Sequence, residues 1–395
     1  MTNKKYRTAA IICIAILIVY DGLQLYQAPL DTYTWTELLI NYAAGFIRRG
    51  LIGKIAYWVS PYISVKFFLS ALITISYLLH LFIYAKITRK IDTFIWMSFL
   101  LSPAAFLFPI YDFAAFGRKD VFLILIFFLS ILLILKRVNL LLTLALVLIL
   151  NEIGVLIHEY ALFFFPFVLV LILIGYRDQS PKLLLLTVVL GVVFMIGNLA
   201  GLYALSRQYY SLDLIAESWQ GLIKDYDLTP QSGAFGWMGV PLKEGLQPEF
   251  DKLSFPRTFF SYAAGFLLSL IPAFLLNERY QILNIVEKAY ADQKWKFTGF
   301  GLLLLSSAAV FVFSSDWGRL MYLFTFHLFI SLIVLKELFG CEDTITENAS
   351  HSSYAKIILI VFIFLYASTW YVKHYVDGDH IALQQGLLFR IFEWL

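Results

Sequence analysis

Long apolar segments dominate this chain and decide what it can fold into. Hydrophobic residues make up 61% of its 395 positions and charged residues only 14%, whereas a soluble domain carries roughly 25% charged residues. A run of roughly 20 apolar residues is long enough to cross the hydrocarbon core of a bilayer as a helix. The sequence therefore predicts an all-α polytopic membrane protein and excludes an ordinary soluble fold.

Hydropathy places about eleven such spans along the chain. They cover residues 8–27, 62–85, 93–111, 121–135, 139–157, 160–175, 183–206, 258–276, 297–314, 320–336 and 356–372. The connections between them leave no room for a second soluble domain. We therefore expect residues 1–395 to form a single transmembrane domain.

Three short connections carry basic residues that indicate the orientation of the chain. They are Lys86 to Lys90, Lys136 to Arg137, and Arg177 to Lys182. Lys and Arg are enriched in the cytoplasmic loops of membrane proteins. The N-terminus lies on the same side as these connections, so the sequence predicts a cytoplasmic N-terminus and an external C-terminus.

Two longer connections fall on the predicted external side. Residues 28–61 mix aromatic side chains with acidic and basic ones, a composition typical of short amphipathic helices at a bilayer surface. Residues 207–257 are rich in Tyr, Trp, Gly, Pro and acids. Aromatic rings beside carboxylates and amides are typical of sugar-binding surfaces, because pyranose faces stack on rings while the hydroxyls need hydrogen bonds. We expect these two stretches to form the active-site face.

Four compact polar motifs share this external side: Phe46–Gly50 (FIRRG), Gly117–Asp120 (GRKD), His158–Tyr160 (HEY) and Asp316–Arg319 (DWGR). Lys and Arg are usually enriched on the cytoplasmic side, so clusters of them on the outer face suggest a binding role. The two N–H groups of an Arg guanidinium can bind two oxygens of a phosphate at once. For any single basic residue, the alternative is a side chain that reaches to lipid headgroups. The residues predicted to bind the phosphate of a lipid-linked substrate are Arg48, Arg49, Arg118, Lys119, His158 and Arg319.

The candidates for the catalytic base are acidic residues: Asp21, Asp31, Asp112 and Glu159. Asp21 closes the first span in the run YDGLQLY, which places a carboxylate at the outer membrane edge. A carboxylate there can take the proton of an acceptor hydroxyl while cations stabilise the departing phosphate. The alternative for Asp21 is a helix-end residue that faces water.

Glu152 lies inside the fifth span, seven positions before Glu159, so the two carboxylates fall on about the same helical face. An intramembrane Glu is a candidate functional residue, and the alternative is a structural partner for Asn151 or for an Arg on another helix. His158 has no second His or Cys at ligand spacing, so neither a metal site nor a cofactor is predicted. The net charge of +3 is spread along the chain and does not indicate nucleic-acid binding.

These features together resemble the integral-membrane glycosyltransferases of the GT-C superfamily and the related bacterial O-antigen polymerases. The resemblance rests on the acid at the end of the first span (Tyr20-Asp21-Gly22), the amphipathic stretch after it, the many spans and the late loop 207–257. The chain departs from the pattern in three respects. The Asp-Glu pair of many members is absent at Asp21-Gly22 and at Asp31-Thr32. No large soluble C-terminal domain is expected after the last span, and the RX10G loops of some O-antigen polymerases are not matched, since Arg207 is followed eleven positions later by Ser218.

The resemblance implies a fold and an activity. The fold would be GT-C-like, and the catalytic acid would lie in the first external loop, at Asp21 or Asp31. The donor would be a polyprenyl-phosphate-linked sugar or oligosaccharide, used at the periplasmic face of the bacterial inner membrane in O-antigen or lipopolysaccharide assembly. Membrane lipid and other polysaccharide-assembly proteins would be the further partners.

Three functional classes fit a chain of this kind to different degrees. A membrane glycosyltransferase places polar groups at one membrane face, which is the predicted pattern. A flippase for polyprenyl-linked saccharides, or another membrane transporter, places charges near mid-bilayer and often shows inverted repeats. A structural subunit needs no cations clustered with acids. We expect an enzyme, with the transporter as the alternative.

Overall fold

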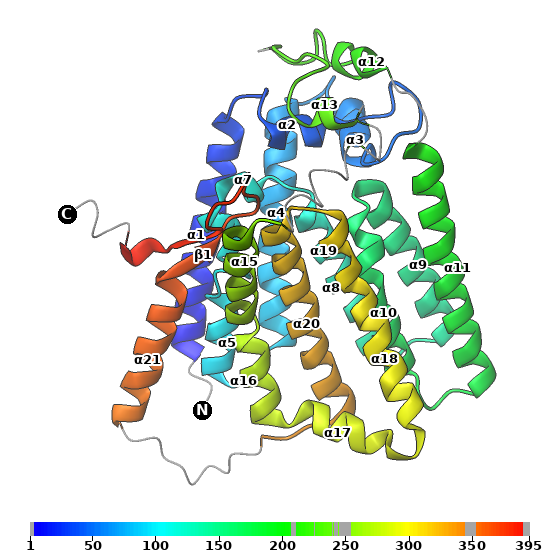
Figure 1. The fold of residues 1–395 in the computed structure, drawn as a ribbon, viewed down its shortest axis with the longest axis vertical. Coiled ribbons are helices and arrows are strands. Elements are labelled where there is room, and N and C mark those ends of the chain that lie inside the picture. Colours follow the sequence, from blue (N-terminus) through cyan, green and yellow to red (C-terminus); the bar gives the residue numbers. More distant parts are fainter. Residues whose placement is uncertain are drawn as a thin grey trace. The chain divides into compact units, whose positions relative to one another are not determined.

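The computed structural model describes residues 4–206, 211–224, 226–238, 240, 244, 254–343 and 353–389. Helices make up most of this part of the chain (Figure 1). Within it, six helical segments are long and apolar enough to cross a membrane: Lys4–Gln27, Val65–Ile87, Leu140–Ile157, Pro181–Leu205, Pro256–Tyr280 and Trp317–Phe339. Shorter apolar helices cover Asp120–Leu135, Tyr160–Gly175, Thr298–Phe313 and Ile357–Ser368. The class of all-α polytopic membrane protein is confirmed, and the number of about eleven spans stays a prediction.

The chain divides into two compact units. Unit 1 comprises residues 1–17, 81–113 and 251–395, and unit 2 comprises residues 18–80 and 114–250. Helices α1 (Lys4–Gln27) and α4 (Val65–Ile87) each contribute residues to both units. The single transmembrane domain stays a prediction.

Unit 2 is built on apolar helices that pack as successive neighbours. They are α8 (Asp120–Leu135), α9 (Leu140–Ile157), α10 (Tyr160–Gly175) and α11 (Pro181–Ser206). Helix α10 is apolar all round and buried along its whole length, as expected for a helix enclosed by others. Helix α11 instead exposes large apolar side chains along its length, a surface suited to lipid.

The directions of these helices place the motifs of unit 2. GRKD precedes α8 and HEY separates α9 from α10, so both lie at the same end of the helices. The basic connections Lys136 to Arg137 and Arg177 to Lys182 lie at the opposite end, because each follows a helix that starts near a motif. Within unit 2, therefore, the polar motifs and the predicted cytoplasmic connections are separated by the length of a helix.

Short helices gather at the motif end of unit 2 (Figure 1). They are α2 (Tyr33–Leu39), α3 (Leu51–Val59), α12 (Leu212–Glu217) and α13 (Ala234–Met238). The Trp219 indole donates to the Leu39 carbonyl at 2.9 Å, and the Ala234 N–H donates to Thr36 Oγ1 at 2.8 Å. These bonds tie residues from the predicted late loop to the first external stretch, although much of 207–257 (207–210, 225, 239, 241–243 and 245–253) lies outside the described residues.

Unit 1 surrounds α20 (Trp317–Phe339), most of which is buried. Its other elements are α5 (Thr93–Leu100), α6 (Phe108–Tyr111), α15 (Pro256–Ser269), α16 (Ile271–Tyr280), α17 (Ile282–Ala289), η1 (Ala291–Gln293), α18 (Lys294–Ser306), η2 (Ser307–Ala309), α19 (Val310–Phe313), α21 (Ser353–Ser368), β1 (Trp370–Val372) and β2 (Leu383–Gln385), while α7 (Phe113–Phe116) begins where this unit ends. Aromatic stacking holds the core, with the rings of Phe99 and Phe329 3.9 Å apart.

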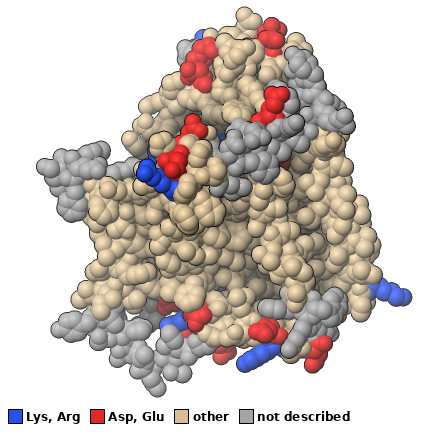
Figure 2. Space-filling view, in the orientation of Figure 1, with Lys and Arg blue, Asp and Glu red and all other residues tan. Residues whose placement is uncertain are grey.

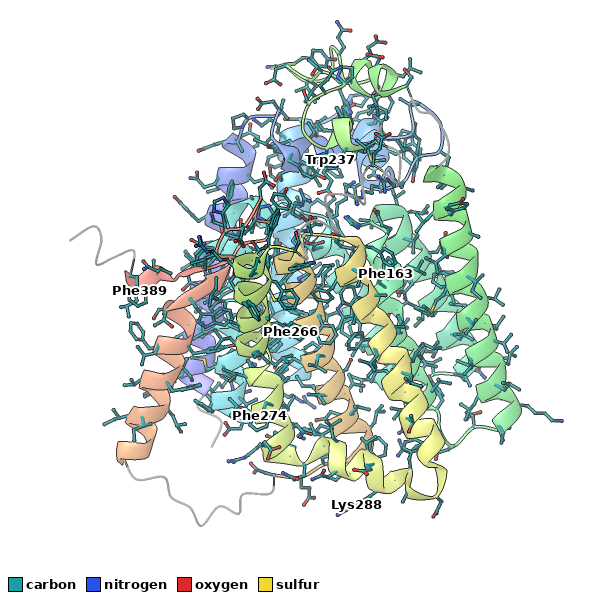
Figure 3. The ribbon with its side chains drawn as sticks, in the orientation of Figure 1. Phe163, Trp237, Phe266, Phe274, Lys288 and Phe389 are labelled. Atoms are coloured by element: carbon teal, nitrogen blue, oxygen red, sulfur yellow. The ribbon has the colours of Figure 1, made fainter. Side chains whose placement is uncertain are left out.

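The surface of unit 1 is apolar along its helices and charged beyond their ends. In Figure 2 charged atoms lie along the lower face of this unit, whereas α15 and the part of α18 from Thr298 onward are almost free of them. Figure 3 shows Phe266 and Phe274 on the apolar stretch α15–α16, and Lys288 beyond it on α17. This distribution is the one expected for helices that face hydrocarbon between charged ends.

Two predicted spans of unit 1 are not continuous helices over their predicted length. The segment 93–111 is not one helix, because α5 stops at Leu100 and α6 begins only at Phe108. Pro103 explains the break, since proline has no N–H to donate and disfavours helical geometry in the residue before it. The last predicted span, 356–372, is helical to Ser368 and then enters β1, which pairs with β2 in antiparallel fashion.

Candidate functional site

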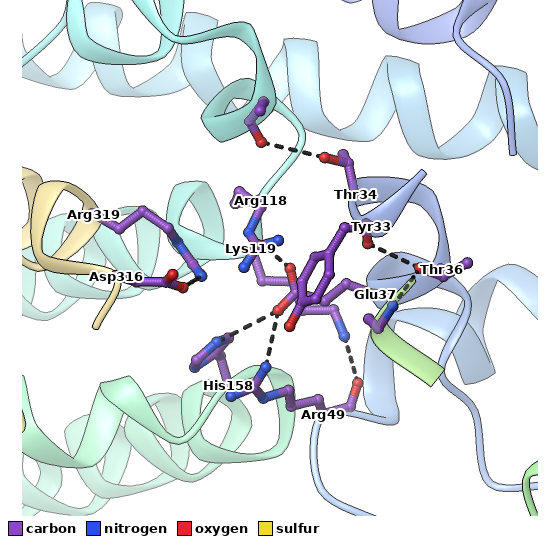
Figure 4. Close-up of polar contacts among 12 residues, drawn as sticks. Tyr33, Thr34, Thr36, Glu37, Arg49, Arg118, Lys119, His158, Asp316 and Arg319 are labelled. Carbon is purple, nitrogen blue, oxygen red and sulfur yellow. Dashed lines mark hydrogen bonds and ion pairs between the residues drawn. The ribbon is translucent and has the colours of Figure 1, made fainter. Parts of the chain in front are cut away.

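Three of the four polar motifs meet around one buried carboxylate in unit 2, that of Glu37 on α2 (Figure 4). Arg49 Nη1 of FIRRG lies 3.2 Å from Glu37 Oε1, and Arg118 Nε of GRKD lies 3.0 Å from Oε2. His158 Nε2 of HEY is 3.6 Å from Oε1. The Glu37 side chain is fully buried, and Arg49 and Arg118 balance its charge.

Glu159 supplies a second carboxylate to this cluster. Arg49 holds it in a bidentate way, with Nε 2.8 Å from Oε2 and Nη2 bonded to Oε1. Burial alone would raise the pKa of Glu159, but the charge of Arg49, together with that of Arg48, holds it well below the usual range. Conversely, Glu159 keeps the pKa of Arg49 well above its usual value despite burial. A carboxylate held ionised in this way is a strong counter-ion and a weak proton acceptor.

The backbone of FIRRG is shaped for these contacts. Arg49 has a φ of 64°, in the left-handed region that residues other than glycine rarely adopt. Such a conformation persists where surrounding contacts enforce it, and it is frequent at functional sites. Here the Arg49 side chain is fixed by Glu37 and Glu159, and its carbonyl accepts a hydrogen bond from Lys119 Nζ at 2.6 Å.

The GRKD turn brings two cations, Arg118 and Lys119, into the interior. The Arg118 guanidinium lies over the Tyr33 ring, 4.4 Å from its centre, a cation–π contact. Lys119 is completely buried, and this burial lowers the pKa of its amine to about 7. Gly117 lets the turn approach closely, because a Cβ at that position would collide with the Thr34 side chain.

His158 faces the central carboxylate of the cluster, with its Nε2 3.6 Å from Glu37 Oε1. The Tyr160 N–H donates to Nδ1 at 3.2 Å, so the proton of the neutral ring sits on Nε2, the nitrogen that faces Glu37. Within the part of the chain that the structure describes, no group of three or more His, Cys, Asp or Glu side chains could hold a metal ion.

A pocket of about 370 Å³ opens beside the cluster in unit 2. Its walls come from α9, α11 and residues 46–48, and Arg48 is its basic group. The Arg48 side chain is 32% exposed, and its Nη1 lies 3.6 Å from Glu159 Oε1, too far for a hydrogen bond. Burial lowers the pKa of Arg48. This guanidinium is therefore the member of the cluster that a ligand in the pocket can reach.

The predicted bases of unit 2 lie in different surroundings. Asp21 is buried on α1, and among the described residues its Oδ2 has no hydrogen-bond partner. Leu25 lies one helical turn after Asp21 on the same face of α1. Its side chain is next to Gly117, because a Cβ added to Gly117 would lie 3.1 Å from Leu25 Cδ1. Asp21 therefore shares a helix face with a residue next to GRKD. Asp31 is exposed.

The remaining predicted residues belong to unit 1 and form pairs there. Asp112 Oδ2 accepts from the His374 backbone N–H at 2.7 Å and lies 2.8 Å from His374 Nδ1. Arg319 is fully buried, and its Nη1 pairs with Asp316 Oδ2 within the DWGR motif. Their roles as a base and as a phosphate ligand stay predictions.

Two residues of these clusters have no role in the sequence-based predictions. Glu37 is the centre of the cluster in unit 2, and its signal is a single acid inside the otherwise uncharged short helix YTWTELL. His374 is the partner of Asp112 from a position 262 residues away. No spacing or motif connects that pair in the sequence.

Comparison with known protein families, curated proteins and solved structures finds no match to this chain. The chemistry of the site therefore rests on its own residues.

Proposed function

We propose that this protein is a membrane glycosyltransferase that uses a lipid-linked sugar phosphate or diphosphate as its donor. It would act in surface-polysaccharide assembly at the periplasmic face of a bacterial inner membrane, either as a single-transfer enzyme or as the O-antigen polymerase. The observation that carries this proposal is the meeting of FIRRG, GRKD and HEY in one cluster that presents Arg48 to a pocket.

The cluster suits a phosphate ligand because its cations are held in place before the ligand arrives. Arg49 and Arg118 are fixed by Glu37, and Arg49 is fixed again by Glu159. Arg48 makes only the long contact to Glu159. A phosphate in the pocket would give Arg48 a closer, charge-assisted partner, while the fixed cations behind it stabilise the added negative charge without reorganisation.

In the proposed reaction the oxygen of an acceptor hydroxyl forms a bond to the anomeric carbon of the donor sugar. The bond between that carbon and the phosphate oxygen breaks, and its electron pair leaves with the lipid phosphate. The proton of the hydroxyl passes to a carboxylate and then to water. Asp21 suits this step better than Glu159, because Glu159 is held ionised by two arginines whereas Asp21 Oδ2 has no hydrogen-bond partner among the described residues.

Replacement of Arg48 tests this assignment. Arg48→Ala removes a charge-assisted contact worth roughly 1.5–3 kcal/mol, so we expect transfer activity to fall on the order of tenfold to a hundredfold. Arg48→Lys keeps the charge without the fork and should fall in between. The measurement is sugar transfer from a radiolabelled lipid-linked donor by membranes with equal amounts of each variant. Lys182→Ala is the matched control, since Lys182 is exposed at the opposite end of unit 2. Full activity in Arg48→Ala would contradict the proposal.

A transporter of lipid-linked saccharides is the second candidate, and one observation favours it. Glu152 on α9 accepts a hydrogen bond from Asn198 on α11 at 2.9 Å, between two apolar helices. Carboxylates inside a membrane are frequent in ion-coupled transport. Transfer of radiolabel to an acceptor by the purified protein separates the two, because a transporter moves its substrate without breaking the bond between sugar and phosphate.

Topology provides an independent prediction. We propose a cytoplasmic N-terminus and a periplasmic C-terminus, because the basic connections of unit 2 lie opposite its motif end. A reporter active only in the periplasm should be active when fused after Leu395 and silent when fused at Arg137. The reverse pattern would place the cluster in the cytoplasm and remove the periplasmic reaction.

A further inference from the structure

One face of α11 lines the pocket in unit 2. Residues Val193, Gly197, Gly201 and Leu205 contribute to the wall and follow one another at intervals of four, which is one face of a helix. Helices α9 and α11 contact each other directly, and Figure 1 shows them as neighbours. The pocket is therefore an elongated space along α11, with Arg48 among its lining residues.

Two glycines leave this space open. A Cβ placed on Gly197 or Gly201 would meet no atom within 4 Å. Glycine inside a helix is destabilising by roughly 0.5–1 kcal/mol relative to alanine, so these glycines weaken α11 without allowing closer packing of a neighbouring helix. Their consequence is an unfilled groove on a helix that otherwise exposes apolar side chains.

The chemistry of the groove restricts its occupant. Most of its lining is apolar, and its polar groups are Arg48 and the Glu152–Asn198 pair. A volume of about 370 Å³ lies at the lower end of the roughly 300–1,000 Å³ usual for ligand pockets, which suits one hydrocarbon chain rather than two. The exposed apolar surface of α11 suits a ligand that arrives from the bilayer.

We infer that this groove binds the hydrocarbon chain of a single-chain lipid phosphate, with its phosphate on Arg48. The further statement that this lipid carries a sugar rests on the proposed function. Because lipid tails are as apolar as the groove, the chain gains little by leaving the bilayer. Selectivity comes instead from the fit of one chain against Gly197 and Gly201, and from the charge of Arg48.

Binding of farnesyl phosphate to the purified protein, measured by native mass spectrometry, tests the inference without any transfer reaction. Gly201→Trp fills the groove, and since no atom lies near the added Cβ, the variant should fold. We expect it to bind at least about tenfold more weakly, and Arg48→Ala tenfold to a hundredfold more weakly. Farnesol, which lacks the phosphate, should bind as poorly to the wild type as farnesyl phosphate binds to Arg48→Ala.

Leu199→Trp is the matched control, because Leu199 is exposed on α11 and does not line the pocket. It should bind farnesyl phosphate like the wild type. Unchanged binding in Gly201→Trp, or equal competition by the two-chain lipid phosphatidylglycerol, would overturn the inference. If farnesyl phosphate binds as expected but the protein transfers no sugar, the inference about the groove is supported and the proposed transferase function is wrong. If Gly201→Trp transfers sugar with an unaltered KM for the lipid-linked donor, the inference about the groove is wrong and the proposed transferase function is unaffected.

Discussion

Glu37→Gln is expected to destabilise the protein by roughly 3–5 kcal/mol, the usual cost when one partner of a buried ion pair is removed. Gln has the size of Glu but no charge, so Arg49 and Arg118 would lose the buried carboxylate that they share. The Arg49 backbone, held at positive φ, would lose one of its anchors as well. Thermal unfolding of the purified protein in detergent measures the effect as a lowered midpoint.

Glu217→Gln is the control for this experiment. Glu217 lies exposed on α12 of the same unit, and a surface change of this kind usually alters stability by less than about 0.5 kcal/mol. Adding Arg118→Gln to Glu37→Gln should recover part of the loss, because it removes one of the two buried cations that Glu37 neutralises. An unfolding midpoint equal to that of the wild type in Glu37→Gln would show that the cluster does not depend on this charge.

The helices of the fold were predictable where apolar runs are long and uninterrupted. Helices α8, α9 and α10 begin and end within two residues of the predicted spans, because a short polar turn separates each apolar run from the next. The break within the segment 93–111 was not predictable from hydropathy. A hydropathy average includes Pro103 as one apolar residue and takes no account of the backbone N–H that proline lacks. The strand at Trp370–Val372 is equally hidden, because it forms by pairing with β2.

Most residues of the cluster in unit 2 were predictable, and the residue at its centre was not. Arg48, Arg49, Arg118, Lys119, His158 and Glu159 stand in short polar motifs, and unit 2 does bring them together. Glu37 carries no such signal, because its role arises from contacts to residues far along the chain. For the same reason the pairing of Asp112 with His374 could not be read from the sequence. Ion pairs of this kind depend on tertiary packing, which periodicity and spacing do not report.

Asp21→Asn is expected to lower turnover by roughly two to four orders of magnitude, the usual contribution of general acid–base catalysis. Asn keeps the size and shape of Asp but cannot accept the proton of the acceptor hydroxyl. Asp21 is buried on α1, shares a helix face with Leu25 beside GRKD, and has an Oδ2 without a hydrogen-bond partner among the described residues. The measurement is transfer from a lipid-linked donor, with membrane abundance and farnesyl phosphate binding determined in parallel.

Both parallel measurements should stay at wild-type levels in Asp21→Asn, because the change removes a proton acceptor and no ligand contact. Asp31→Asn is the matched control, since Asp31 is exposed and precedes α2, and its effect should be much milder. Asp112→Asn and Glu159→Gln complete the set. Normal transfer by Asp21→Asn, together with loss in Asp112→Asn at full abundance, would move the base to the Asp112–His374 pair of unit 1. Loss in Glu159→Gln together with a lowered unfolding midpoint would instead report the ion pair with Arg49. Asp21 is the base only if its variant loses turnover while the fold and lipid binding persist.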